Sequence, residues 1–222
     1  MNAPRPNAER LRFSSTVYLF YEGLTELRYL QDISAGNLVH IVKGGQNAAP
    51  VKLLEMAVRF VRKEGKRILR TIQDPHIWIV FDDDEKPDIR GAAEWFAHHS
   101  ASIPDTFRER VHVGYMKPCI ELWGMLCHPK GKKAFRRALT HTAMQRELHR
   151  IMPTYEHEGN PFFDVAAMIE IPFATKTAKN WERTFGPFPI CTGATFFAGI
   201  YPLVESIAGS SPELKEGKHE SA

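Results

Sequence analysis

The stretch that decides the expected fold is His76-Ile77-Trp78-Ile79-Val80-Phe81-Asp82-Asp83-Asp84-Glu85-Lys86-Pro87-Asp88. Residues 77–81 form an unbroken apolar run rich in β-branched and aromatic side chains, which is typical of a strand. Because polar residues do not alternate along the run, we expect both faces of the strand to be covered, as in a parallel sheet. Four acidic side chains then follow at the carboxyl end of the strand, where ligands bind in open α/β sheets. Neighbouring carboxylates repel one another, and a divalent cation would stabilise them.

A second acidic residue follows an earlier strand in the same way. Residues 16–21 are another apolar run without alternation, and this run ends at Glu22-Gly23. Helical spacing of apolar residues follows over 25–33, so Glu22 lies at a strand-to-helix turn. We expect Glu22 to converge with Asp82 if the two strands are adjacent and parallel. Asp82 and Asp84 share one side if the extended backbone continues through the acidic motif.

The other expected elements also alternate between strand and helix. Their ranges are strands at 38–42 and 110–115, a helix that begins at Pro50, a helix at 90–100, a helix-like stretch at 118–128, and helices at 130–150, 164–170 and 195–207. This alternation predicts an α/β fold with a parallel sheet flanked by helices. We divide the chain into a flexible tail at 1–15, an α/β core at 16–130, a mainly helical extension packed on the core at 131–208, and a flexible tail at 209–222.

The composition is that of an ordinary globular protein. The chain has 222 residues, of which 43% are hydrophobic and 25% are charged, and its net charge of +3 says little by itself about nucleic acid. Its three cysteines, Cys119, Cys127 and Cys191, form no CxxC pair, so neither a zinc ribbon nor a disulfide framework is indicated. No apolar run approaches the length of a membrane span, and no signal-peptide core is present at the N-terminus. We therefore expect a cytoplasmic protein without membrane contact.

Two stretches are strongly basic. Residues 59–70 carry six basic side chains against one acidic side chain, and residues 130–150 carry seven against one. Such stretches are usually solvated helix faces, but they can also bind the phosphate backbone of nucleic acid in a salt-dependent manner. The candidate nucleic-acid-binding residues are Arg62, Lys66, Lys117, Lys132, Lys133, Arg136 and Arg137.

The motifs at these positions, in this order, resemble those of the RloB-like proteins. They are Tyr21-Glu22-Gly23-Leu24-Thr25-Glu26, then Phe81-Asp82-Asp83-Asp84, then Pro118-Cys119-Ile120-Glu121-Leu122-Trp123 with His128 after it. The resemblance covers roughly residues 15–130. Where the family has Asn-Pro-Cys-Phe-Glu-Leu-Trp, this chain has Lys117 and Ile120 in place of the asparagine and the phenylalanine. The lysine removes an amide, although it could contact phosphate.

The resemblance implies a Toprim-type fold and a role in bacterial defence. It implies that Glu22, Asp82 and Asp84 hold Mg²⁺ or Mn²⁺ and that Glu121 or His128 assists catalysis. The expected activity is then a metal-dependent nuclease that hydrolyses phosphodiester bonds of DNA or RNA in anti-phage or abortive-infection defence. Such a reaction needs neutralisation of the phosphoryl charge and an activated water, which Mg²⁺ or Mn²⁺ supplies.

Other interpretations of the same residues stay open. The acidic run can be a solvated loop or a helix N-terminus, Glu121 can cap a helix, and His128 can be a structural histidine. One alternative function is a non-catalytic Toprim-shaped module that binds nucleic acid or a partner protein in a defence complex. A further alternative is a phosphotransferase or small-nucleotide enzyme that uses the same metal site.

Overall fold

The computed structural model describes residues 16–34, 39–41, 49–83, 89–155, 171–185 and 197–208. Asp84 and Cys191 lie outside these ranges, and so do the helix expected at 164–170 and the two expected tails.

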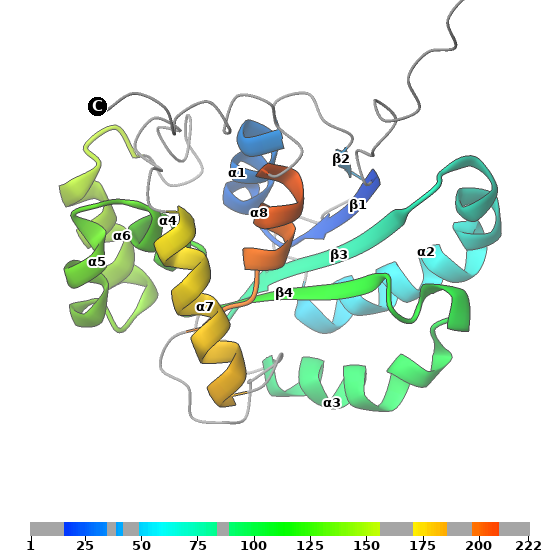
Figure 1. The fold of residues 1–222 in the computed structure, drawn as a ribbon. Helices are drawn as coiled ribbons and strands as arrows, with labels where there is room; N and C mark the ends of the chain where they lie inside the picture. Colours follow the sequence, from blue (N-terminus) through cyan, green and yellow to red (C-terminus); the bar gives the residue numbers. More distant parts are fainter. Residues whose placement is uncertain are drawn as a thin grey trace, which may run out of the picture.

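A five-stranded sheet in the order β2-β1-β3-β4-β5 forms the centre of the molecule (Figure 1). The strands are β1 Thr16–Tyr21, β2 Val39–Ile41, β3 Pro75–Asp82, β4 Val111–Lys117 and β5 Phe197–Ala198. The first four strands are parallel, and β5 pairs antiparallel to β4. The predicted parallel sheet is therefore confirmed, with an antiparallel strand added at one edge.

Eight α-helices and three short 3₁₀ helices surround the sheet within the described ranges. The helices are α1 Leu24–Ser34, α2 Pro50–Thr71, α3 Ile89–His99, α4 Glu121–Cys127, α5 Gly131–Ala134, α6 His141–Ile151, α7 Ile171–Phe185 and α8 Tyr201–Ala208. The 3₁₀ helices are η2 Ser100–Ser102, η3 Asp105–Phe107 and η4 Phe135–Arg137. None of the helices in the described part of the chain is both long enough and apolar enough to cross a membrane.

Both faces of the sheet are buried, which confirms the interpretation of the apolar run in β3. Trp78 and Val80 point into a hydrophobic cluster formed with α1, α4, α6, α7 and α8. Ile77, Ile79 and Phe81 point into a second cluster, formed with α2 and α3 on the opposite face. Successive side chains of a strand point to opposite faces, so a strand that is apolar at every position can fill two cores.

The strand order reverses direction between β1 and β3. The chain moves from β1 outward to β2 and then returns across the sheet to β3 on the other side of β1. The connecting helices α1 and α2 accordingly lie on opposite faces (Figure 1). At such a topological switch point the connections after the two strands diverge and leave a crevice at their carboxyl ends.

The predicted helix at 195–207 is wrong at its start. Phe197 and Ala198 pair with Lys117 and Met116 of β4, and the Gly199 amide donates to the Tyr115 carbonyl at 2.9 Å. A Cβ on Gly199 would lie 2.9 Å from that same carbonyl oxygen, so the close approach requires glycine. The free edge of β4 thus pairs with a segment whose local sequence favours a helix.

The predicted helix at 130–150 is also wrong in its continuity, because it is split into α5, η4 and α6. The break lies at 138–140, and Thr140 begins α6 as its N-cap, with its side chain accepting a hydrogen bond from the Ala143 amide at 3.3 Å. Helix α7 is not among the elements predicted from the sequence. Ala174 and Ala178 of α7 lie buried in the same cluster as α4 and α8, so the residues after 170 share the core of the sheet domain.

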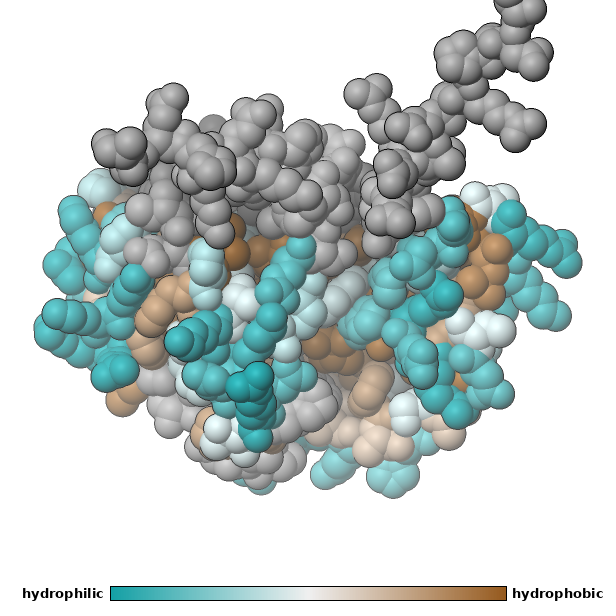
Figure 2. All heavy atoms as spheres, in the orientation of Figure 1, coloured by the Kyte–Doolittle hydropathy of each residue, from teal (hydrophilic) through white to brown (hydrophobic). Residues whose placement is uncertain are grey.

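A histidine pair lies at the amino ends of β3 and β4, at the opposite edge of the sheet from the acidic motif. The Nδ1 atom of His76 lies 2.9 Å from Nε2 of His112, and the His112 ring stacks on Trp78 with centroids 4.7 Å apart. The pair borders a cavity of about 420 Å³ whose lining also includes Phe96 and Tyr201. Figure 2 shows hydrophobic side chains recessed between hydrophilic ones on this side of the molecule. Burial, followed by the charge of His76, lowers the pKa of His112 from 6.5 to about 4.

We expect the free energy of unfolding to fall as the pH is lowered from about 6.5 towards 4, and His112→Gln to remove part of this dependence. In that range the unfolded chain binds a proton at His112 that the folded protein excludes, so acid favours unfolding. In His112→Gln, the free energy of unfolding should depend less steeply on pH, by at most about 1.4 kcal/mol per pH unit. The difference should be smaller than this limit because solvent screens the partly exposed ring. Urea titrations across this range measure it. His76→Gln should narrow the pH range over which the free energy of unfolding falls, because the burial of His112 remains after the charge of His76 is removed. An unchanged pH dependence of the free energy of unfolding in His112→Gln would contradict the assignment.

Candidate functional site

Glu22 and Asp82 meet at the carboxyl ends of β1 and β3. Tyr21 pairs with Val80 in the parallel register, and the Glu22 amide donates to the Val80 carbonyl at 3.2 Å. The Asp82 amide donates to Glu22 Oε2 at 3.2 Å. Both side chains are buried, with 7% of Glu22 and 6% of Asp82 exposed. Two buried acidic residues 60 positions apart in sequence are thus joined by a hydrogen bond at the switch point of the sheet.

Asp82 is also tied to the segment that precedes α4. Its Oδ2 atom accepts a hydrogen bond from the Ile120 amide at 3.2 Å. One backbone N–H therefore orients Glu22, and another orients Asp82. Hydrogen bonds from backbone amides hold carboxylates in fixed positions, which is a requirement for a metal-ligand set.

Asp83 is directed towards β4. The Tyr115 hydroxyl donates to Asp83 Oδ2, and the Lys117 ammonium lies 3.4 Å from the same oxygen. The Asp83 amide donates to the Met116 carbonyl at 2.8 Å, which continues the pairing of β3 with β4. Asp83 therefore pairs with β4, while Asp82 meets Glu22. The ammonium of Lys117, a predicted phosphate contact, pairs with Asp83.

A further buried acid lies in the first turn of α1. Only 4% of Glu26 is exposed, and a Cβ on Gly23 would lie 2.8 Å from its Oε2 atom. The Glu26 side chain thus folds back over Gly23, beside the end of β1. The sequence alone suggests an ordinary first-turn helix acid at this position; its burial next to Glu22 is a tertiary feature.

Glu121 begins α4 and is almost completely buried, at 1% exposure. Its Oε1 atom accepts hydrogen bonds from the Tyr155 hydroxyl at 2.5 Å and from Gln145 Nε2 at 3.3 Å. Nε2 of His141 lies 3.8 Å from the same oxygen. Glu121 is therefore at the centre of a polar cluster inside the protein.

Tyr155 donates a hydrogen bond to Glu121 from a buried position. Burial raises the pKa of Tyr155 most, and the neighbouring charge of Glu121 raises it further, with smaller contributions from Cys119 and Asp82. Because the pKa is raised, the hydroxyl stays protonated at neutral pH and remains a hydrogen-bond donor to Glu121.

His128 does not lie with these groups. It follows α4 at the end opposite Glu121, and the helix of seven residues separates the two by about 10 Å. Its Nδ1 atom accepts a hydrogen bond from the Lys130 amide at 3.2 Å. Burial, and then the charge of Lys130, lower the pKa of His128. A catalytic role for His128 stays a sequence prediction.

The two basic stretches lie at opposite ends of the parallel strands. Helix α2 runs back from the carboxyl edge to the amino edge, so Arg62 and Lys66 in its second half lie far from the acids (Figure 1). Helix α5 and η4 pack beside α4 at the carboxyl edge. They carry Lys132, Lys133, Arg136 and Arg137, of which the last three are exposed. Only the second stretch is on the same side as Glu22 and Asp82.

The charged residues buried in the described part of the chain are all acidic: Glu22, Glu26, Asp82, Asp83 and Glu121. Burying carboxylates is costly unless cations or hydrogen-bond donors compensate their charge. Lys117 and His141 contribute at the rim, where each keeps part of its side chain exposed. This distribution of charge suits a site that binds a cation.

Three polar residues around Glu121 are not indicated by the sequence motifs, namely His141, Gln145 and Tyr155. They follow Glu121 by 20, 24 and 34 positions and reach it only after α6 has packed on α4. The spacing of His141 and Gln145, four residues apart, puts both on one helix face and is the one local signal available. Cys119 is fully buried and lies in the same cluster.

One family model matches most of the chain. The model, described as RloB-like protein, aligns with residues 17–207. No curated protein and no solved structure matches the chain significantly.

Proposed function

The chain belongs to the RloB-like protein family, and from this premise we propose that it is a Mg²⁺- or Mn²⁺-dependent nuclease with a Toprim-like fold. In this proposal it hydrolyses phosphodiester bonds of DNA or RNA in the cytoplasm, as part of bacterial anti-phage or abortive-infection defence. The Toprim likeness and the defence role rest on the resemblance of the three motifs, and the chemistry rests on the residues themselves.

The convergence of Glu22 and Asp82 is the observation that carries the proposal. The two buried carboxylates lie at the carboxyl ends of adjacent parallel strands, where the strand order reverses. This is the general ligand-binding position in open α/β sheets. Carboxylate oxygens are the protein ligands that Mg²⁺ prefers, and one or two of them suffice because water and phosphate complete its shell. Asp84 is proposed as a third ligand from the sequence motif.

The residues of the chain have distinct roles in this proposal. A divalent cation held by Glu22 and Asp82 would neutralise charge on the phosphoryl group and lower the pKa of a bound water. The Asp82 amide orients Glu22, and the Ile120 amide orients Asp82. Glu121 is already held by the Tyr155 hydroxyl and Gln145 Nε2, so it has no catalytic role in this proposal.

The basic residues of α5 and η4 are the proposed contacts to the nucleic-acid backbone. Lys133, Arg136 and Arg137 are exposed at the edge of the sheet that carries the acids. Arg62 and Lys66 belong to the other edge and are left out of this interface. Binding through phosphate contacts should weaken as the salt concentration rises.

The test is cleavage of a substrate panel by the purified protein with Mn²⁺, with Mg²⁺ and with a chelator. The panel contains single-stranded and double-stranded DNA, RNA and free nucleotides. We expect cleavage of at least one polynucleotide that the chelator abolishes and added Mn²⁺ restores. Glu22→Gln should lose both this cleavage and saturable Mn²⁺ binding in calorimetry, because the neutral amide is a much weaker ligand.

Each alternative function predicts a different result in this panel. Salt-dependent binding of a polynucleotide without any cleavage would overturn the nuclease and favour the non-catalytic binding module. Turnover of free nucleotides alone would favour the small-nucleotide enzyme, which has no need of the basic residues beside α4. Cleavage that survives in Glu22→Gln would refute the assigned ligand.

A further inference from the structure

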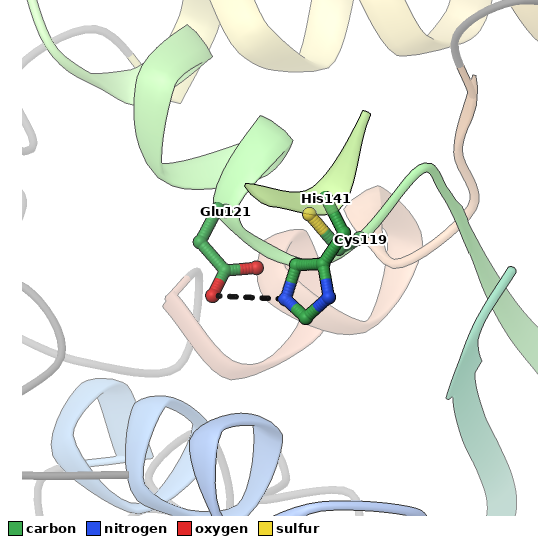
Figure 3. A group of neighbouring side chains, drawn as sticks. All are labelled: Cys119, Glu121 and His141. Carbon is green, nitrogen blue, oxygen red and sulfur yellow. Dashed lines mark ion pairs between the residues drawn. The ribbon is translucent and has the colours of Figure 1, made fainter. Parts of the chain in front are cut away.

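Cys119, Glu121 and His141 bring three different metal-binding atoms together beside α4. One thiol sulfur, one carboxylate oxygen and one imidazole nitrogen all lie within 4.8 Å of one another. Figure 3 shows the three side chains converging: Cys119 two residues before the start of α4, Glu121 at its first residue, and His141 at the first residue of α6. It is the one group of at least three such residues with ligand-atom spacing that the described ranges contain.

The donor types distinguish this cluster from the carboxylates of the strands. Mg²⁺ and Mn²⁺ favour oxygen ligands, whereas a thiolate combined with an imidazole selects Zn²⁺. Zinc binds cysteine, histidine and glutamate side chains in tetrahedral sites. In such a site a nitrogen and an oxygen ligand lie about 3.3 Å apart. The observed distance of 3.8 Å between Glu121 Oε1 and His141 Nε2 needs only a small adjustment.

Gln145 and Tyr155 form hydrogen bonds with two of the three side chains. Nε2 of Gln145 lies 2.6 Å from Nε2 of His141 and 3.3 Å from Oε1 of Glu121. Since an amide nitrogen donates, Nε2 of His141 accepts through its one lone pair, so a metal bound at this nitrogen would replace the Gln145 hydrogen bond. The Tyr155 hydroxyl donates to Glu121 Oε1 at 2.5 Å. The hydrogen bond from Tyr155 orients the Glu121 carboxylate, as hydrogen bonds to ligating carboxylates do in protein metal sites.

One side of the cluster reaches the protein surface. Cys119 and Glu121 are buried, but 31% of the His141 side chain is exposed. Structural zinc sites are closed by four protein ligands, whereas catalytic zinc sites have three and leave one position for water or substrate. Three ligands at the edge of the protein correspond to the second type.

We propose that Cys119, Glu121 and His141 form a zinc site, with a solvent molecule in the fourth position. The site is separate from the proposed Mg²⁺ or Mn²⁺ ligands, and it does not depend on the proposed nuclease activity. The two are neighbours, because Ile120, whose amide orients Asp82, lies between two of the zinc ligands. Zinc at this site would fix the start of α4 and thereby help to position Asp82.

The first test is on the parent protein, expressed in zinc-supplemented medium and dialysed before elemental analysis. We expect about one equivalent of Zn²⁺ per chain. Replacement by Co²⁺ should give a thiolate-to-cobalt charge-transfer band in the near ultraviolet. A parent protein without stoichiometric zinc and without this band after Co²⁺ addition would overturn the proposal, whatever the variants do.

Cys119→Ser and Cys127→Ser form a matched pair, because both cysteines are buried and Cys127 ends α4 away from the cluster. Cys119→Ser should abolish the charge-transfer band and lower zinc affinity by more than about 100-fold, since even the loss of an outer partner costs up to that factor. Cys127→Ser should retain both. His141→Gln should lose affinity but keep a sulfur band at saturating Co²⁺. Retention of the band in Cys119→Ser, or its loss only in Cys127→Ser, would refute the ligand set. Far-ultraviolet circular dichroism checks that each variant is folded.

The proposed zinc site and the proposed nuclease activity can be refuted separately. Asp82→Asn should keep zinc and the cobalt band while it loses Mn²⁺-dependent cleavage. A parent that binds zinc through Cys119 but cleaves nothing would overturn the proposed function alone. A parent that cleaves with Mn²⁺ but binds no zinc would overturn the zinc site alone.

Discussion

Asp82→Asn is expected to lower the rate of Mn²⁺-dependent phosphodiester cleavage by about 10³-fold, which corresponds to about 4 kcal/mol of transition-state stabilisation. The asparagine has the same shape, and its carbonyl oxygen can still accept the hydrogen bond from the Ile120 amide. The fold should therefore persist while the charge that holds the cation is lost. Initial rates at saturating Mn²⁺, together with calorimetric titration of Mn²⁺, measure the effect.

Asp83→Asn is the matched control for this prediction. Asp83 is the next residue and is equally buried, but its carboxylate faces Tyr115 and Lys117 of β4. We expect its cleavage rate to stay within about threefold of the parent rate. Equal losses of cleavage rate in the two variants would mean that both substitutions act by disturbing the fold and not by removing a metal ligand. An unchanged rate in Asp82→Asn would remove Asp82 from the site.

Trp123→Ala is expected to lower the free energy of unfolding by about 3–5 kcal/mol, the usual cost of truncating a buried aromatic side chain. Trp123 is fully buried on α4, among side chains from β1, β3 and five helices. Its Nε1 atom donates to the Tyr29 hydroxyl at 2.5 Å, so the truncation also removes a hydrogen bond between α4 and α1. Equilibrium unfolding in urea measures the loss.

Two further variants separate packing from hydrogen bonding at Trp123. Trp123→Phe keeps most of the ring volume but loses the donor, and should cost about 1–2 kcal/mol. Trp95→Ala is the control on α3, where the indole is partly exposed and stacks on the exposed His99. It should cost about 1 kcal/mol. Equal losses for Trp123→Ala and Trp95→Ala would contradict the role of Trp123 as a core residue.

The elements predicted best are those whose pattern is continuous and local. The apolar run at 16–21 became β1 with the same bounds, and the helix that begins at Pro50 buries Leu53, Leu54, Ala57, Val58 and Val61 as the spacing predicts. Such patterns predict which side chains of an element are buried, and this prediction does not require knowledge of distant contacts. The helix predicted at 195–207 is observed only from Tyr201, because Phe197 and Ala198 pair with the open edge of β4. Local propensity carries no information about a strand partner 80 positions away in the sequence.

For the candidate site, the sequence by itself determined which acids lie at the ends of β1 and β3, and that parallel strands would bring them to one edge. The tertiary structure decided the rest. It directed the Asp82 carboxylate to the Ile120 amide and the Asp83 carboxylate to β4, two directions that an unbroken run of aspartates cannot distinguish. It also brought His141 and Tyr155 to Glu121. The physical reason is that strand positions follow from local periodicity, whereas side-chain partners depend on how separate elements pack across the sheet.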